Sequence, residues 1–259
     1  MTIEIVPVAC LKDNFAYLVR DGGASGGAGV AAVVDAPEAG PILAALEARG
    51  WGLQEAWITH HHDDHVQGLA GLRERHALSV TGARADAHRL PPLDRPVGPG
   101  ATLDLGGARA EVLDVPGHTV GHLAFHLPAA RAVFTADSLM AMGCGRLFEG
   151  TPAQMWNSLC ILASLPEDTV VYSGHDYLET NLRFALSVEP ENAALRERAE
   201  RDERRRREGR AMEHPTLALE LATNPTLRAS RPETKAAIGM GSASDLEAFT
   251  EIRRRRDGF

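Results

Sequence analysis

Short apolar runs alternate with polar turns and helical stretches through the first two thirds of the 259-residue chain. Alternating or β-branched runs predict strands at residues 3–8, 15–20, 30–35, 55–59, 110–115, 131–136 and 169–174. Helical spacing predicts helices at 40–49, ending before Gly50, and at 152–164. The glycine-rich stretch at 21–30 is interpreted as the loop of a hairpin. Together these elements indicate a layered sandwich of sheets and helices.

The sequence changes character near residue 178, where charged helical patterns replace the short strands. A helix is predicted at 191–210, because glutamates precede arginines by four residues, the favourable order for ion pairs on a helix. The four arginines at 204–207 are interpreted as its solvated face. A last helix is predicted at 242–256, with Ser244 as its N-cap. We therefore predict a sandwich domain at 1–177 and a small helical domain at 178–259.

Composition narrows the class of protein. Hydrophobic residues make up 44% of the chain, as in ordinary globular proteins. The net charge of −8 argues against nucleic-acid binding. Three cysteines (Cys10, Cys144 and Cys160) form no disulfide framework, which suits a reducing compartment. No signal peptide or membrane-spanning apolar run is evident. We expect a cytoplasmic monomer that binds neither membrane nor nucleic acid.

The strongest chemical signal is HHHDDH at 60–65, directly after a predicted strand. Alternate side chains of an extended segment point the same way, so His60 and His62 can converge on one ion. Asp64 and His65 are adjacent and can reach a second ion nearby. Imidazole and carboxylate ligands suit zinc, iron or manganese. The alternative, a surface histidine cluster or a helix cap, is disfavoured by four ligand-type residues at this spacing.

Three further predicted strands also end in ligand-type residues. His118 lies in PGHTVGH, Asp137 in FTADS and His175 in SGHDY. Each alone would be an ordinary loop residue, but open sheets of this kind place ligands beyond the carboxyl ends of their strands. Their common position therefore makes all three candidates. His122 is expected to support His118 from beside it.

These motifs, in this order, resemble the pattern of the metallo-β-lactamase fold over residues 1–177. Four further stretches resemble the glyoxalase II family: MGCGRLFEGT (142–151), SGHDYLETNLRFA (173–185), HPTLALE with NPTLR (214–228) and the terminal RRRRDGF. The resemblance implies an α+β protein, an αββα sandwich with a C-terminal helical domain. It also implies a thiolester hydrolase that converts S-D-lactoylglutathione to glutathione and D-lactate in methylglyoxal detoxification.

The same resemblance implies a site with two divalent metal ions, zinc in the first instance and iron or manganese as alternatives. It assigns one ion to His60, His62 and His118, the second to Asp64, His65 and His175, and makes Asp137 the bridge. Asp64 and Asp137 would be the catalytic carboxylates. The nucleophile would be a hydroxide bridging the metals, because two cations lower the pKa of a shared water.

The resemblance implies a second set of residues that bind the glutathione thiolester. Arginine can grip a carboxylate with two parallel hydrogen bonds, and glutathione carries carboxylates. By position these residues are Arg146, Phe148, Tyr177, Asn181, Arg253 and Arg256. Arg146 and Arg256 stand where the family commonly has lysine, and Phe148 where a tyrosine is frequent, so affinity and acyl preference stay open.

Another hydrolase of the metallo-β-lactamase fold is one alternative function, and a dioxygenase of that fold is a second. A glutathione persulfide dioxygenase of the same fold would need one iron held by two histidines and an aspartate. The complete second ligand set and the helical domain disfavour it. A protein that binds metal as a scaffold without catalysis is the alternative of another class. Cys144 as a covalent nucleophile is discounted, because the sequence offers no separate histidine–acid pair to activate it.

Overall fold

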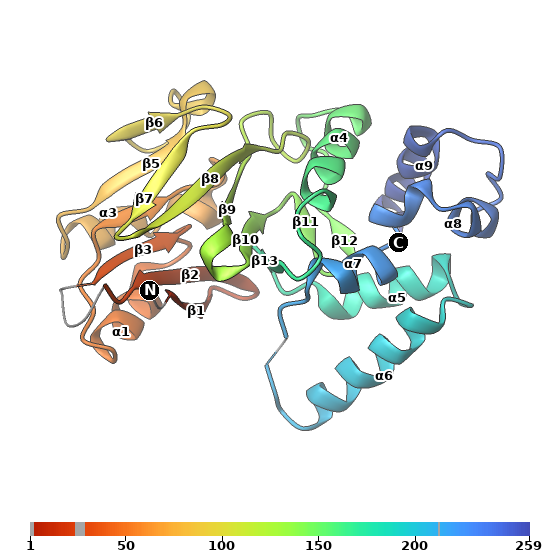
Figure 1. Ribbon diagram of the computed structural model, residues 1–259, viewed down its shortest axis with the longest axis horizontal. Helices are drawn as coiled ribbons and strands as arrows, with labels where there is room; N and C mark the ends of the chain where they lie inside the picture. Colours follow the sequence, from red (N-terminus) through yellow and green to blue (C-terminus); the bar gives the residue numbers. More distant parts are fainter. Residues whose placement is uncertain (1–2, 24–28, 212) are drawn as a thin grey trace. The chain divides into compact units, whose positions relative to one another are not determined.

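The computed structural model describes residues 3–23, 29–211 and 213–259 (Figure 1). The chain divides into two compact units. The first contains Met1–Asp114 and Gly121–Ala136, and the second contains Val115–Val120 and Asp137–Phe259. Each unit is described separately below.

The first unit contains a six-stranded sheet whose strands follow one another in chain order (Figure 1). The strands are β1 (Ile3–Cys10), β2 (Asn14–Asp21), β3 (Val30–Val34), β4 (Glu55–Trp57), β5 (Ser79–Ala83) and β6 (Arg95–Val97). Pairing is antiparallel from β1 to β3 and parallel from β3 to β6. Helix α1 (Ala39–Glu47) links β3 to β4 and packs against α3 (Leu69–Arg73).

A second sheet in the same unit is antiparallel, in the order β10–β9–β8–β7. Its strands are β7 (Thr102–Leu105), β8 (Ala108–Asp114), β9 (Leu123–Leu127) and β10 (Ala132–Ala136). Aromatic side chains join the two sheets: the rings of Trp57 and Phe125 lie 5.6 Å apart, and those of Tyr17 and Phe134 lie 5.5 Å apart. All four are at most 2% exposed, so the core of this unit lies between its sheets.

The second unit is mainly helical. Its helices are α4 (Pro152–Ala163), α5 (Leu178–Val188), α6 (Ala193–Arg207), α7 (Leu217–Thr223), α8 (Pro232–Ala237) and α9 (Asp245–Asp257). Its short strands are β11 (Leu139–Met140), β12 (Gly143–Cys144) and β13 (Val170–Ser173). Thr151 and Ser244 form capping boxes that begin α4 and α9. The rings of Trp156 and Phe249, 5.6 Å apart, pack these two helices together.

Every strand and helix predicted from the sequence is present, with bounds shifted by a few residues. Ser244 is the N-cap of α9 as predicted, and the arginines at 204, 206 and 207 are exposed as expected of a solvated face. Strands β2 and β3 pair with Asp21 opposite Val30, as a hairpin requires, while residues 24–28 of the predicted loop lie outside the described residues. Within residues 3–23, 29–211 and 213–259, none of the helices combines the length and apolar character that crossing a bilayer requires.

Strands β5, β6, β7 and β9 were not predicted. They are short, of three to five residues. The sequence of β9, LAFHL, is buried at every position, so it shows no alternation of polar and apolar residues. Three 3-10 turns (Arg84–Asp86, Pro128–Ala130 and Leu227–Ser230) and the one-turn helix α2 (Asp63–Val66) also lack a pattern of their own.

Candidate metal centre

The first unit presents four predicted ligands immediately after strand β4. His60 and His65 are fully buried, because the chain passes from the sheet directly into helix α2. The Nε2 atom of His60 lies 3.2 Å from Nδ1 of His62. The Nε2 atom of His65 lies 4.0 Å from a carboxylate oxygen of Asp64. Within this segment His60 thus lies close to His62, and His65 close to Asp64, while the ring centroids of His60 and His65 are also only 4.2 Å apart.

Asp35, one residue beyond β3, orients two of these imidazoles: that of His65 directly and that of His60 through Thr59. It is 2% exposed, and its Oδ2 atom accepts hydrogen bonds from Nδ1 of His65 and from the Thr59 hydroxyl, both at 2.8 Å. The Thr59 oxygen lies 3.0 Å from Nδ1 of His60 and, having donated its proton to Asp35, accepts there. Both imidazoles therefore carry their proton on Nδ1, which leaves the Nε2 lone pair for a metal.

Other neighbours hold the rest of this loop. Asn14, at the start of β2, donates to the backbone and side-chain oxygens of Asp64 at 3.0 and 3.1 Å. His122, expected beside His118, stacks on the ring of His60 with centroids 4.7 Å apart. His61 lies 3.5 Å from Asp86. The sequence pattern indicates neither Asn14 nor Asp35 as a functional residue, because each is an ordinary polar residue at the boundary of a strand.

The second unit brings together the other three predicted ligands. One oxygen of Asp137 lies 3.4 Å from Nε2 of His118 and 3.4 Å from Nε2 of His175. All three residues are at most 6% exposed. The Nδ1 atom of His118 donates to the carbonyl of Arg146 at 2.8 Å, so its Nε2 also presents a lone pair. The ring of His175 stacks on that of Tyr177, with centroids 4.8 Å apart.

These spacings suit metal ligands. Donor atoms about 2.1 Å from a tetrahedral metal lie roughly 3.4 Å from one another. The His60–His62 distance of 3.2 Å and the two Asp137 distances of 3.4 Å fall at this value. One carboxylate oxygen of Asp137 therefore lies at the spacing expected of a ligand that shares a metal with His118 or His175. The residues of each unit therefore fit a bound divalent metal.

The six predicted substrate-binding residues all lie in the second unit, but their exposure differs. Phe148 is 61% exposed, Tyr177 is 38% exposed, and the guanidinium of Arg146 lies over the Phe148 ring. Arg256 is partly exposed and donates to Oδ1 of Asn181 at 3.1 Å. Burial, together with nearby Arg253 and Arg146, lowers the pKa of Arg256. Three arginines thus lie near one another and form a cationic cluster.

Arg253 and Asn181 are buried and already bind backbone groups. Arg253 is 5% exposed and donates to the carbonyl of Cys144 at 2.8 Å and to Asp257 at 2.9 Å. Asn181 is 4% exposed and donates to the carbonyl of Ala141 at 3.0 Å. These two side chains hold the chain between β11 and Arg146, a role that the sequence does not reveal.

The cysteines lack the properties of nucleophiles. Burial raises the pKa of the Cys144 thiol, and it raises that of Cys10 to about 11. A thiolate, the reactive form, is therefore disfavoured at both positions at neutral pH. This agrees with the discounting of Cys144 as a covalent nucleophile.

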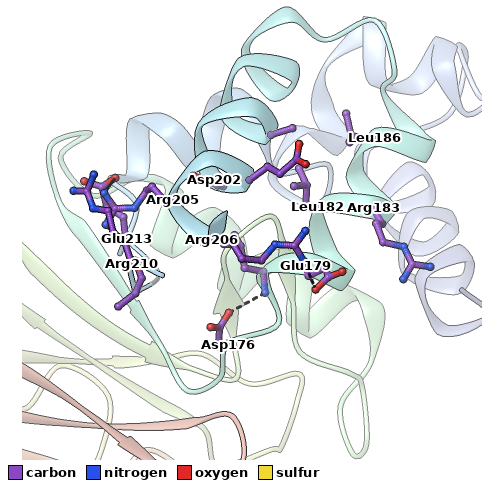
Figure 2. Close-up of a pocket in the computed structure, with 14 residues that line it drawn as sticks. Asp176, Glu179, Leu182, Arg183, Leu186, Asp202, Arg205, Arg206, Arg210 and Glu213 are labelled. Atoms are coloured by element: carbon purple, nitrogen blue, oxygen red, sulfur yellow. Dashed lines mark hydrogen bonds and ion pairs between the residues drawn. The ribbon is translucent and has the colours of Figure 1, made fainter. Parts of the chain in front are cut away.

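A cavity of about 540 Å³ lies against helices α5 and α6 of the second unit (Figure 2). Leu182 and Leu186 contribute to its apolar wall. Charged side chains surround it in opposite pairs, with Arg206 2.9 Å from Glu179 and Arg205 3.5 Å from Glu213. The lining thus carries charged side chains of both signs, and the cavity gives no sign of a particular ligand.

Comparison with known proteins places this fold and these ligand clusters in one class. Residues 14–175 match the metallo-β-lactamase superfamily, and the chain has that fold. Residues 176–259 match the family described as the C-terminus of hydroxyacylglutathione hydrolase. The chain therefore belongs to the hydroxyacylglutathione hydrolase family of the metallo-β-lactamase superfamily.

Individual relatives agree with this membership. The hydroxyacylglutathione hydrolase of Ruegeria pomeroyi is 59% identical over 259 residues, which cover 100% of both chains. Among solved structures, ETHE1 from Myxococcus xanthus has a TM-score of 0.67 at 23% identity, covering 98% of this chain and 90% of its own. TTHA1623 in a di-iron-bound form has a TM-score of 0.59 at 27% identity, covering 86% and 98%.

The predictions of family, α+β fold class and thiolester hydrolase are confirmed by these comparisons. Superfamily membership and the histidine–aspartate clusters point to a protein that binds divalent metal. The individual roles of the metal ligands and of the substrate-binding residues, and the domain boundary, stay predictions.

Proposed function

We propose that the chain hydrolyses S-D-lactoylglutathione and related 2-hydroxyacyl-glutathione thiolesters to glutathione and the free 2-hydroxy acid, a step of methylglyoxal detoxification. Family membership and the 59%-identical relative named hydroxyacylglutathione hydrolase support the reaction. The observation that carries the proposal within the structure is the carboxylate oxygen of Asp137 at 3.4 Å from two imidazoles.

The seven ligands are proposed to hold two divalent ions. His60, His62 and His118 would bind one, Asp64, His65 and His175 the other, and Asp137 both. Zinc is proposed, with iron or manganese as alternatives that imidazole and carboxylate ligands also suit. When bound, such a pair of metals lowers the pKa of a shared water and polarises the thiolester carbonyl. Asp35 and Thr59 keep the proton of His65 and His60 on the ring nitrogen that faces away from the metal.

The cationic cluster is proposed to bind the glutathione part of the substrate. Arg146, Arg253 and Arg256 carry three positive charges, of which Asp257 offsets one, because it lies 2.9 Å from Arg253 and 3.7 Å from Arg146. The surplus suits a tripeptide with two carboxylates. The exposed rings of Phe148 and Tyr177 can pack along the peptide, and Tyr177 adds a hydroxyl.

We propose that no protein acid is needed for product release, because a thiolate is a good leaving group. Asp64 and Asp137 then act through the metals they bind. We also propose a catalytic domain at residues 1–177 and a substrate-binding helical domain at 178–259. The protein is proposed to work as a cytoplasmic monomer without a nucleic-acid partner.

The proposal is tested by following the thiolester absorbance of S-D-lactoylglutathione with purified protein of measured metal content. We expect rapid turnover with close to two metals per chain, and loss of turnover when chelation removes them. Protein with two metals per chain that leaves the thiolester intact would refute the activity. Oxygen uptake with glutathione persulfide, measured on the same sample, separates the dioxygenase reaction from the hydrolase.

A further inference from the structure

The hairpin formed by β11 and β12 connects a proposed metal ligand to a proposed substrate ligand. It begins at Leu139, two residues after Asp137, and ends at Cys144, two residues before Arg146. Each strand is only two residues long. Met142, in the turn between the two strands, has a φ of 55°, a conformation that residues other than glycine rarely adopt. So short and strained a hairpin needs support from outside itself.

That support comes from buried polar side chains of the helical region. Four of them bind the backbone of Met140–Cys144: Asn181 to the carbonyl of Ala141, Glu220 to the amide of Met142, Asn224 to the carbonyls of Met140 and Gly143, and Arg253 to the carbonyl of Cys144. These bonds range from 2.8 to 3.2 Å, and the four side chains are at most 5% exposed. The position of the hairpin is therefore set by the helices.

Glu220, in helix α7, links these bonds into one cluster with Arg198 and Asn224. It is fully buried, and its Oε2 atom accepts from the amide of Met142 and from Asn224, both at 2.9 Å. Its Oε1 atom lies 2.7 Å from the guanidinium of Arg198, itself 2% exposed and bonded to Thr223. Removing two charges from water is costly, and well-packed apolar residues are often as stable. A buried ion pair here is better explained by the geometry it imposes than by stability.

The backbone carries the position of the hairpin to the metal ligands. A Cβ atom on Gly145 would lie 1.9 Å from the carbonyl oxygen of Asp137 and 3.1 Å from Nδ1 of His118, so the chain passes tightly against both. The next carbonyl along the chain, that of Arg146, accepts a hydrogen bond from Nδ1 of His118. A displaced hairpin would therefore move the acceptor that orients His118 and disturb the main chain of Asp137.

We propose that Glu220, with Arg198 and Asn224, is a positioning residue for the metal site: it fixes the β11–β12 hairpin and thereby orients His118 and Asp137. The inference rests on the proposed metal assignment. It gives the C-terminal helical region a second task besides binding substrate, because the region also completes the ligand geometry.

The test compares Glu220→Gln with Glu189→Gln. Glu189 is a matched control: it is 5% exposed in the same unit, but its carboxylate binds Arg228 at 2.9 Å and Thr234 at 2.7 Å rather than the hairpin. Each protein is loaded with Co(II), whose visible absorption reports ligand geometry, and its metal affinity is measured by competition with a chelator.

We expect Glu220→Gln to change the Co(II) spectrum and to weaken metal binding about tenfold. Its kcat should fall by about tenfold or more with KM within roughly twofold. Glu189→Gln should lower stability alone. A wild-type spectrum, affinity and kcat in Glu220→Gln would overturn the proposal, as would equal effects of both variants. If Glu220→Gln does not fold, Asn224→Ala gives the same readings, since it removes both carbonyl contacts and keeps the Glu220–Arg198 pair.

These readings separate the two proposals. If the wild-type protein fails to hydrolyse the thiolester, the function is wrong, while the Co(II) spectrum and the chelator competition still test the positioning role. Unchanged metal properties in an active Glu220→Gln protein sink the positioning role alone.

Discussion

The substitution Asp35→Asn tests whether the carboxylate of Asp35, which is not itself a proposed metal ligand, controls the orientation and the protonated nitrogen of His60 and His65. Asp35 accepts three hydrogen bonds at 2.8 Å, from the amide and hydroxyl of Thr59 and from Nδ1 of His65. Its φ is 56°, a left-handed conformation that asparagine tolerates well. The substitution therefore keeps shape and backbone but turns one acceptor oxygen into a donor.

The magnitude follows from the bonds that are lost. The amide can still accept from the backbone of Thr59, but its NH₂ group faces the Thr59 hydroxyl and the N–H of His65. Hydrogen bonds to charged groups contribute about 1.5–3 kcal/mol each, and the threonine hydroxyl can rotate to recover part of one, so we expect about 2–4 kcal/mol of lost stability. His65 would avoid the facing donor by moving its proton to Nε2, the metal-binding atom. Metal affinity should then fall about 10–100-fold, or roughly 1.4–2.8 kcal/mol.

Urea unfolding of the metal-free proteins measures the loss of folding stability. Competition with a chelator on the folded proteins measures the loss of metal affinity. Asp21→Asn is the matched control, because Asp21 is 1% exposed in the same unit and accepts from the amides of Gly107 and Gly23. It should lose stability and keep metal affinity. Wild-type metal affinity in a destabilised Asp35→Asn protein would refute the reasoning, and so would an equal loss of affinity in both variants.

Three further outcomes are expected. Asp137→Ala should lose both metals and turnover, because its carboxylate oxygen lies 3.4 Å from two ligand imidazoles; metal analysis that finds two ions in an active variant would contradict the bridge. Replacing Arg146 and Arg256 by alanine should raise KM about tenfold or more with kcat little changed, because remote carboxylates are bound equally in ground and transition states; a loss confined to kcat would contradict a binding role. Burial lowers the pKa of His214 from 6.5 to about 4, so the unfolded chain binds a proton more readily and stability falls as the pH drops from 6.5 towards 4. His214→Gln should flatten that decline, by up to about 3 kcal/mol, in urea midpoints measured across this window.

The ligand-type residues were predictable because each follows a strand that its own sequence defines. AVFTA and VVYS are apolar runs of β-branched and aromatic residues, and they become β10 and β13, directly before Asp137 and near His175. The spacing within HHHDDH likewise predicted that His60 and His62 lie close together, because the side-chain parity of an extended chain is a local property. Local patterns therefore carry the ligands themselves.

Asp35 shows what such patterns do not contain. Its position at the end of an apolar run predicts only the last residue of a strand, whereas its partners Thr59 and His65 lie 24 and 30 positions further on. Glu220 is a similar case, since the amide it binds is 78 positions away. Nothing near either residue in the sequence distinguishes it from a surface carboxylate, because burial and partner are set by the tertiary fold.

Arg253 shows what a resemblance leaves open. The terminal basic motif predicted a substrate ligand, but the side chain is buried and donates to the carbonyl of Cys144. Position in a motif gives residue type and approximate place, while exposure decides what the side chain can reach. Among the three arginines of the cationic cluster, Arg146 and Arg256 are the more exposed to solvent-borne carboxylates, and Arg253 also holds the chain between β11 and Arg146.

The two units use different chemistry for the same task of orienting an imidazole. In the first unit, the side chain of Asp35 accepts a hydrogen bond from His65, so a single substitution at Asp35 can remove the group that orients this imidazole. In the second, the acceptor for His118 is the backbone carbonyl of Arg146, which no substitution removes. A substitution can therefore alter this contact only by moving the main chain, and Glu220 and Asn224 hold the main chain of Met140–Gly143 a few residues before Arg146. On the proposed metal assignment, the helical region would be coupled to the orientation of His118 even where it binds no substrate.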